Sequence, residues 1–392
     1  MYKLIELESG ICSASGFYAD GISAGLKAKS AKDMAFIYSE KECEIASVFT
    51  TNKMTAAPIR HFRQKGLFQT NFVLINSKNA NAMTGNAGID DIDEILATLP
   101  SKVINPVMSS TGVIGVRLPK EKIINGAKLF DLSKKEAHSA SEAIMTTDSF
   151  SKEIAFRVEL EDGSSFNIGA MAKGAGMINP AMATMLCFIT TDADVNKAEM
   201  QSILDEVTLT TFNAASVDGD TSTNDTVMLL SNGLSKVYNA DAFKEALHKI
   251  MLFLAREMVR DGEGATKLVT YKISGAKDNK EAEIVAKALS NSLLMKTALY
   301  GEDPNWGRIA STVGASGVDA DESTLTISFN ELCVYKKGTL LFDTDMEKKA
   351  SKVMKLEAFT ISCDLGLGEG EFEAYGCDLG YEYVKINADY RT

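Results

Sequence analysis

The stretch from Lys173 to Thr191 constrains the fold most, because its two halves are chemically unlike. The first half, as far as Pro180, carries two glycines, an asparagine and a proline, which is typical of an irregular loop. The second half, from Thr184 onward, contains a continuous apolar run of strand length, which is typical of a buried strand. The sequence therefore predicts a loop that enters the interior of a sheet at Thr184.

Thr184 follows the small residue Ala183, and this junction admits two interpretations. A threonine hydroxyl is a poor nucleophile unless a base removes its proton, and an N-terminal threonine carries such a base in its own α-amine, whose pKa is about 7.7–8.0. The hydroxyl could attack the preceding carbonyl, shift the acyl group from nitrogen to oxygen and be released by water. The first interpretation is therefore self-cleavage that creates a catalyst. The second is an ordinary β-branched residue that enters a strand.

The composition is ordinary for a soluble globular protein. The chain is long enough for one large or two ordinary domains. Of its 392 residues, 45% are hydrophobic and 24% are charged, and the net charge is −12. A strongly acidic chain has no basic field to attract phosphates, which argues against nucleic-acid binding. No apolar run is long enough to span a bilayer. The first residues lack the features of a signal or transit peptide, so we expect a cytoplasmic protein.

Neither the cysteines nor the histidines predict a metal site. The six cysteines are scattered without a Cys-x-x-Cys pair, which is typical of reduced core thiols. The three histidines lie far apart, with no His-Glu-x-x-His motif. The loop from Asp218 to Asp225 departs from a calcium loop, because its sixth and twelfth positions hold Thr223 and Leu229. We therefore expect no metal.

Apolar periodicity predicts a chain in which strands and helices alternate. Strands are predicted over residues 34–38, 44–49, 71–76, 103–109, 152–160, 165–171, 184–191, 226–230, 268–273, 325–329 and 358–365. Helices are predicted over residues 90–99, 118–132, 133–143, 196–212, 241–260 and 281–295, with Ser133 as an N-cap. The tail from Tyr383 to Thr392 is interpreted as an apolar strand tied to the body.

Two further stretches could carry chemistry. Thr111 and Gly112 follow a predicted strand, where a backbone N–H beside glycine and the Thr111 hydroxyl would suit an oxyanion hole; a plain turn fits the same residues. Residues 21–25 match the Gly-x-Ser-x-Gly nucleophile elbow, with Ser23 as nucleophile and a later histidine as base. That elbow needs a strand before it and a helix after it, and the small polar residues before it favour a glycine-rich turn.

These stretches resemble the ornithine acetyltransferase family, the glutamate N-acetyltransferases that cut themselves before a threonine. The longest match is Lys-Gly-Ala-Gly-Met-Ile-Asn-Pro-Ala-Met-Ala-Thr-Met-Leu at residues 173–186. Other matching blocks lie at residues 76–85, 110–115, 144–149 and 299–308 and near the C-terminus, so the resemblance covers essentially the whole chain.

The resemblance implies transfer of acetyl from N2-acetylornithine to L-glutamate through an acetyl-Thr184 intermediate, in arginine biosynthesis. It places the oxyanion hole at Thr111 and Gly112. The substrate-binding residues that it implies are Thr147, Lys173, Thr184, Glu263, Asn387 and Thr392. No cofactor is implied. Acetyl-CoA as a co-substrate distinguishes bifunctional from monofunctional members, and the sequence leaves that open.

The fold implied by the resemblance is an α/β fold, layered as an α-β-β-α sandwich. A cut between Ala183 and Thr184 would leave an α chain of residues 1–183 and a β chain of residues 184–392, intertwined and associated as two of each. The alternative is a related N-terminal-nucleophile aminopeptidase or amidohydrolase, which passes the acyl group to water. A transferase must exclude water from its site, whereas a hydrolase admits it. An assay with acetylornithine and glutamate would tell the two activities apart.

Overall fold

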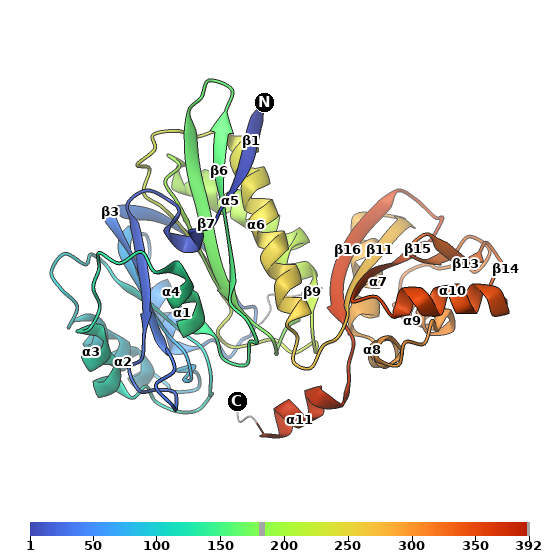
Figure 1. Cartoon of the computed structure of the whole chain (residues 1–392), viewed down its shortest axis with the longest axis horizontal. Coiled ribbons are helices and arrows are strands. Elements are labelled where there is room, and N and C mark those ends of the chain that lie inside the picture. The colour runs from blue at the N-terminus through green and yellow to red at the C-terminus, as the bar shows by residue number, and fades with distance from the viewer. Residues whose placement is uncertain (180–184, 390–392) are drawn as a thin grey trace.

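The computed structural model describes residues 1–179 and 185–389 and consists of two bodies side by side (Figure 1). The larger body is built from roughly the first two thirds of the chain, and the smaller one begins at strand β11 (Leu268–Ala276). The last helix, α11 (Tyr381–Asp389), leaves the smaller body and returns beneath the junction of the two. Ala183, Thr184 and Thr392, which the sequence singled out, lie outside the described residues.

A mixed sheet organises the larger body. Its strand order is β1-β6-β7-β8-β10-β3-β4-β5, and β2 pairs with β3. The bounds are β1 (Tyr2–Leu7), β2 (Phe17–Ile22), β3 (Met34–Phe49), β4 (Thr70–Asn76), β5 (Val107–Ser110), β6 (Lys152–Leu160), β7 (Ser165–Lys173), β8 (Leu186–Thr191) and β10 (Thr226–Ser231). The predicted strands at 34–38 and 44–49 are one strand, β3, whose register with β4 shifts between Tyr38 and Cys43. That irregularity lets one end of β3 pair with β10 and the other with β2 and β4.

Alternate side chains of the central strands enter two different cores, as the period of a strand requires. In β8, Cys187 and Ile189 face a core formed with helices α5 (Lys197–Thr210) and α6 (Ala240–Arg260). Leu186 and Phe188 face a second core that contains residues of β3 and β4 and of helix α4 (Ala137–Ile144). Strand β8 is therefore buried on both faces, which explains its unbroken apolar sequence.

A third core lies on the outer side of β3 and β4. It gathers Met34, Phe36 and Leu74 with residues of α2 (Ala87–Leu96) and α3 (Lys120–Ala127). Helices α5 and α6 therefore cover one face of the sheet, and α2 and α3 cover β3 and β4. The remaining short elements are α1 (Ala57–Gln64) and the 3₁₀ turns η1 (Gly10–Cys12) and η2 (Phe212–Ala214). The mixed α/β class predicted from the sequence is confirmed.

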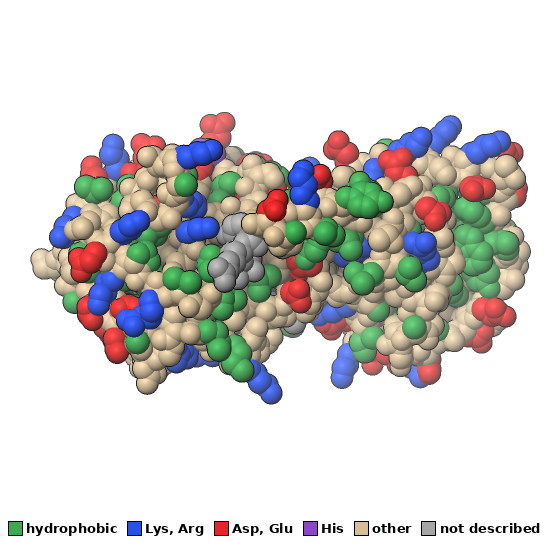
Figure 2. Space-filling view, turned by 90° about the horizontal axis from the view of Figure 1, so that it is seen from below, with side chains coloured by type: hydrophobic (Ala, Val, Ile, Leu, Met, Phe, Trp, Pro, Cys, Tyr) green, Lys and Arg blue, Asp and Glu red, His purple; other side chains and the backbone are tan. Residues whose placement is uncertain are grey.

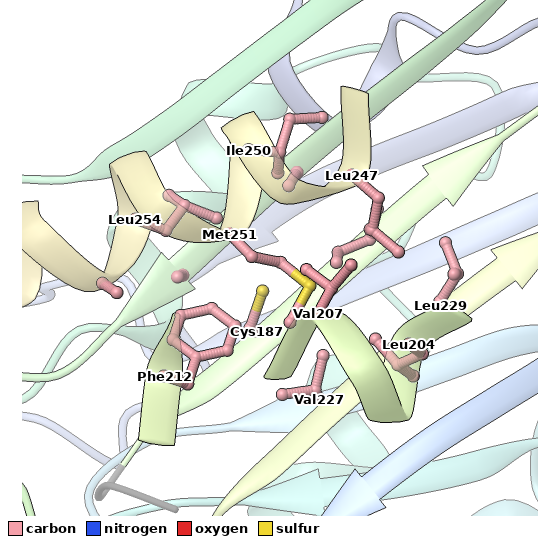
Figure 3. Packing of buried hydrophobic residues seen from close by; sticks show 14 of the residues in the cluster. Cys187, Leu204, Val207, Phe212, Val227, Leu229, Leu247, Ile250, Met251 and Leu254 are labelled. Atoms are coloured by element: carbon pink, nitrogen blue, oxygen red, sulfur yellow. The ribbon is translucent and has the colours of Figure 1, made fainter. Parts of the chain in front are cut away.

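Helix α6 follows its apolar stripe closely. It begins after Asn239, whose side chain accepts a hydrogen bond from Ala242 N–H. Figure 3 shows Leu247 and Met251 pointing toward Val207 of α5 and the strand residues beneath. Each such fully buried side chain contributes about 1.5–3 kcal/mol to folding. Packing of this stripe against β6 and β7 fixes where α6 ends, and the loop after α6 reaches the site described below.

The smaller body has its own sheet and core, with strand order β14-β13-β12-β15-β11-β16-β9. Its further strands are β9 (Ala215–Ser216), β12 (Thr326–Phe329), β13 (Leu332–Lys336), β14 (Thr339–Leu340), β15 (Ala358–Asp364) and β16 (Gly370–Cys377). Its helices are α7 (Asn279–Asn291), α8 (Leu293–Tyr300), α9 (Trp306–Ala315) and α10 (Thr344–Met354). Strand β9 follows η2 of the larger body, so it links the two bodies.

Three sequence predictions were wrong in detail. The helix at 281–295 is two helices, because Ser292 leaves the helical conformation and accepts a hydrogen bond from Met295 N–H as the cap of α8. Ser133 is no N-cap: α4 begins at Ala137, and the Ser133 hydroxyl donates to Asp131. The tail is the helix α11 and not a strand, and none of its described residues is buried.

Among the described residues, no helix combines the length and the apolar character needed to cross a bilayer.

Candidate functional site

A cavity of about 210 Å³ lies where loops of the larger body meet the C-terminal helix. Figure 2 shows acidic side chains along the groove between the two bodies on this face. The cavity is lined by Thr111, Gly112, Thr146, Thr147, Lys173, Gly176, Met177, Asp218, Asp220, Glu263, Tyr383 and Asn387. Six residues that the sequence singled out, Thr111, Gly112, Thr147, Lys173, Glu263 and Asn387, are among them. Thr184 and Thr392 lie outside the described residues.

Thr111 and Gly112 follow β5, beside the loop that follows β4. Because β4 and β5 are parallel neighbours, their carboxyl ends reach the same edge of the sheet. Thr111 is buried, and its N–H donates to Asn76 O at 3.0 Å. Gly112 has φ +129°, and a Cβ there would clash with the backbone of Lys78. The turn therefore requires glycine, and its backbone can approach a ligand closely.

Lys173 is the last residue of β7, and its side chain is 3% exposed. Its Nζ lies 3.8 Å from Asp148 Oδ2, the sole carboxylate oxygen within 4 Å of that ammonium in the described chain. Burial lowers the pKa of Lys173, and the charge of Asp148 opposes that shift. As far as the described residues go, the ammonium group thus faces the cavity without a close anionic partner.

Asp148 is held by several donors. Burial would raise the pKa of its carboxyl, but the ammonium groups of Lys173 and Lys152 outweigh that effect. The N–H groups of Thr146 and Gly174 also donate to it, at 2.9 and 2.6 Å, and the pKa of Asp148 falls to about 2. Asp148 is therefore a fixed negative charge directly beside Thr147.

Glu263 reaches the cavity from the loop after α6. Its N–H donates to Ala175 O at 2.8 Å, and its Oε2 accepts from the side-chain amide of Asn387 at 2.7 Å. Gly176 lies against this carboxylate, since a Cβ at Gly176 would come within 2.6 Å of Glu263 Cδ. The loop after β7, which contains Gly176, and the loop after α6 thus allow the Lys173 ammonium and the Glu263 carboxylate to face the same cavity.

The sequence did not single out Asp218 and Tyr383 as site residues. Asp218 accepts hydrogen bonds from the N–H groups of Met177 and Ile178 at 2.7 and 2.9 Å, and burial raises its pKa. The Tyr383 hydroxyl donates to Asp218 Oδ2 at 3.2 Å, and burial, followed by the charge of Asp218, raises the pKa of Tyr383. The Asp-Gly-Asp turn at residues 218–220 is the sequence signal that could have indicated Asp218. The described residues contain no cluster of His, Cys, Asp and Glu able to hold a metal.

Asp225 lies beside the start of β8. Its Oδ1 accepts from Met185 N–H at 3.1 Å, while its buried Oδ2 has no hydrogen-bond partner in the described part of the chain. Burial raises the pKa of Asp225 well above its usual range. A buried acid thus adjoins the residue that follows the predicted nucleophile.

The nucleophile elbow around Ser23 is wrong. Strand β2 does precede it, but the chain then loops around Asp33, which accepts hydrogen bonds from the N–H groups of Ala24 and Leu26 at 2.6 Å. No helix follows before β3. None of the three histidines lines the cavity described above. Ser23 therefore lacks both the geometry and the base.

Comparison with known proteins gives a consistent result. The ArgJ family model matches residues 18–392. The arginine biosynthesis bifunctional protein ArgJ of Wolinella succinogenes is 60% identical over the full length of both chains, and that of Dehalococcoides mccartyi is 43% identical over 98% of each. A crystal structure of the Bacillus halodurans arginine biosynthesis bifunctional protein argJ is 39% identical, with a TM-score of 0.50 over 52% of this chain and 98% of that one. By sequence along its whole length, this chain belongs to the ArgJ family of arginine biosynthesis proteins.

Proposed function

We propose that this chain is a glutamate N-acetyltransferase of arginine biosynthesis, which moves acetyl from N2-acetylornithine to L-glutamate and releases ornithine. Membership of the ArgJ family supports this reaction. The observation that carries it is the cavity in which Thr111, Lys173 and Glu263 meet. A hydroxyl donor, a cation for an α-carboxylate and an anion for an ammonium group are what such a pair of amino-acid substrates requires.

Thr184 is the proposed nucleophile, exposed by self-cleavage after Ala183. Its hydroxyl oxygen attacks the acetyl carbonyl carbon while its α-amine takes the hydroxyl proton. The bond from carbonyl carbon to nitrogen then breaks, and ornithine leaves with that proton. The amine of glutamate then attacks the ester carbonyl carbon, the ester C–O bond breaks, and the α-amine of Thr184 passes the proton lost by glutamate to the leaving hydroxyl oxygen. One amide is exchanged for a similar one, so no external energy source is needed.

The pocket residues take distinct parts in this scheme. Thr111 and Gly112 stabilise the oxyanion of each tetrahedral intermediate. Lys173 binds the α-carboxylate, and Glu263, oriented by Asn387, binds an ammonium group. Thr147 and Thr392 complete the substrate-binding set.

The cut chain is proposed to stay together as residues 1–183 and 184–392, assembled as two copies of each. Strands β8 and β10, from after the cut, lie between β7 and β3, from before it, which supports intertwined fragments. The B. halodurans chain, which matches about half of this one over nearly its own full length, fits such a division. A cytoplasmic location is supported by six unpaired cysteines.

The decisive experiment is an initial-rate assay with acetylornithine and glutamate, then with acetyl-CoA and glutamate. An acetyl-enzyme predicts parallel double-reciprocal lines at several glutamate levels, and intersecting lines would exclude it. Acetylglutamate formed from acetyl-CoA would place the chain among bifunctional enzymes. Release of free acetate as the main product would instead identify an amidohydrolase. Ser23→Ala should keep full activity.

A further inference from the structure

Four buried charges form a network beside the cavity. Its members are Asp148, Lys152, Lys173 and Asp261, and each side chain is 3% exposed or less. Lys173 lines the cavity, whereas the other three lie behind it. Buried charges are costly unless they are paired, so the arrangement of the pairs has a functional or structural reason.

Each of the three N–H donors of the Lys152 ammonium has a partner in the protein. Its Nζ donates to Asp148 Oδ1 at 3.0 Å, to Asp261 Oδ2 at 2.6 Å and to Phe150 O at 3.2 Å. An ammonium group has three N–H bonds, so Lys152 has none left for a ligand. Lys152 is therefore a fully satisfied structural cation.

Lys173 is held quite differently. It shares Asp148 with Lys152, but at 3.8 Å from the other carboxylate oxygen, which is too far for a hydrogen bond. Lys152 and Gly174 N–H already occupy Asp148 Oδ1, and Thr146 N–H binds Oδ2. Asp148 thus stabilises the charge of Lys173 without engaging it closely.

The network also joins three of the chain segments that line the cavity. Asp148 follows Thr147, Lys173 is itself a member, and Asp261 lies two residues before Glu263. Asp261 additionally accepts from Ser149 N–H at 3.0 Å, so the end of α6 is fixed to the segment containing Thr147.

We propose that Asp148 and Lys152 are positioning residues for Lys173. Lys152 draws Asp148 away, and Asp148 in turn keeps Lys173 charged yet free to bind the substrate carboxylate. This inference deepens the proposed function and rests on its assignment of Lys173 to that carboxylate.

Every charged group near Lys173 bears on its protonation. Asp148, Glu263 and Asp225 favour the ammonium form, while burial and Lys152 disfavour it. Lys27, on the loop after β2, is a further neighbouring cation, and its own pKa is lowered by burial to about 8. Removal of the Asp148 charge should therefore lower the pKa of Lys173 further.

The first test is Asp148→Asn, with acetylornithine and its α-carboxamide as paired donors. We expect a KM for acetylornithine near the parent value at about pH 6.5, rising about tenfold or more by pH 9, with kcat little changed. The KM for the carboxamide should not show that rise. The preference for the carboxylate donor should consequently fall with pH in this variant alone.

The second test is Lys152→Met, with Lys249→Met as a matched loss of a lysine whose ion pair is exposed. Freed from Lys152, Asp148 should pair directly with Lys173, so the KM for acetylornithine should rise about tenfold at every pH. Lys249→Met should match the parent. Each variant is first shown by mass to be cleaved and by thermal unfolding to be folded.

Lys173→Met tests the carboxylate-binding role of Lys173 separately from the positioning roles of Asp148 and Lys152. If it discriminates between acetylornithine and the carboxamide as the parent does, the proposed role of Lys173 fails. If Lys173→Met loses that discrimination but Asp148→Asn and Lys152→Met change both donors equally at every pH, the positioning inference is overturned. Should Lys152→Met fail to fold, the pH profile of Asp148→Asn alone decides, because the variant keeps the shape of the side chain.

Discussion

The side-chain amide of Asn387 donates a hydrogen bond of 2.7 Å to Glu263 Oε2. This contact connects two segments more than a hundred residues apart, the C-terminal helix α11 and the loop after α6. Because α11 buries none of its described residues, surface contacts hold it in place: this hydrogen bond, that of Tyr383 to Asp218, and the edge-on ring contact of Tyr381 with Tyr300.

Asn387→Ala should therefore weaken substrate binding by releasing Glu263. We expect KM for acetylornithine to rise about three- to tenfold with kcat little changed, since one hydrogen bond to a charged group is lost. Val384→Ala, on the same helix but 65% exposed and outside the cavity lining, is the control and should behave as the parent. A loss confined to kcat would show that the contact serves the chemical step instead.

Denatured protein should give two masses divided between Ala183 and Thr184, whereas native gel filtration should give one species. The two fragments should co-elute because strands from both lie in alternate blocks of one sheet. Thr184→Ala should remain a single inactive chain of 42.3 kDa. A fully active uncut enzyme would rule out the N-terminal threonine.

Thr111→Ala and Lys173→Ala should produce opposite kinetic defects. A donor to the oxyanion acts mainly in the transition state, so Thr111→Ala should lower kcat by about 10²–10³-fold. A group that binds the carboxylate throughout should mainly change KM. The comparison is made on cleaved enzyme, since self-cleavage passes through an oxyanion of its own. If Thr111→Ala mainly changed KM and Lys173→Ala mainly lowered kcat, the roles assigned to these two residues would be wrong.

Asp225→Asn should change how stability depends on pH. Because burial raises the folded pKa of Asp225 well above its usual range, the folded state binds more protons than the unfolded state at pH values between the unfolded and the folded pKa. The parent therefore loses stability as pH rises through that window, and the variant should lose less. Urea unfolding between pH 4.5 and 8, on a Thr184→Ala background to keep one chain, measures this. Exposed Asp90→Asn should leave the slope unchanged, and an equal slope for Asp225→Asn would contradict the assignment.

Local patterns were enough to predict the central elements. The apolar run that became β8 and the stripe of α6 each depend on residues within a few positions, so the sequence predicts them directly. Helix ends were predicted less well: Ser292 breaks a continuous apolar pattern only because its side chain caps α8. The tail was mispredicted because its tyrosine, valine and isoleucine residues favour a strand, whereas α11 buries no apolar face that would impose a helical period.

By itself, the sequence determined the order of strands and helices and the family, because apolar periodicity and a long motif are properties of neighbouring residues. Only the tertiary structure brought Lys173 and Glu263 to one cavity and placed Asp148, Lys152 and Asp261 behind it. The physical reason is that a buried charge is stabilised by partners far along the chain, and the packing of strands, helices and loops decides which partners those are.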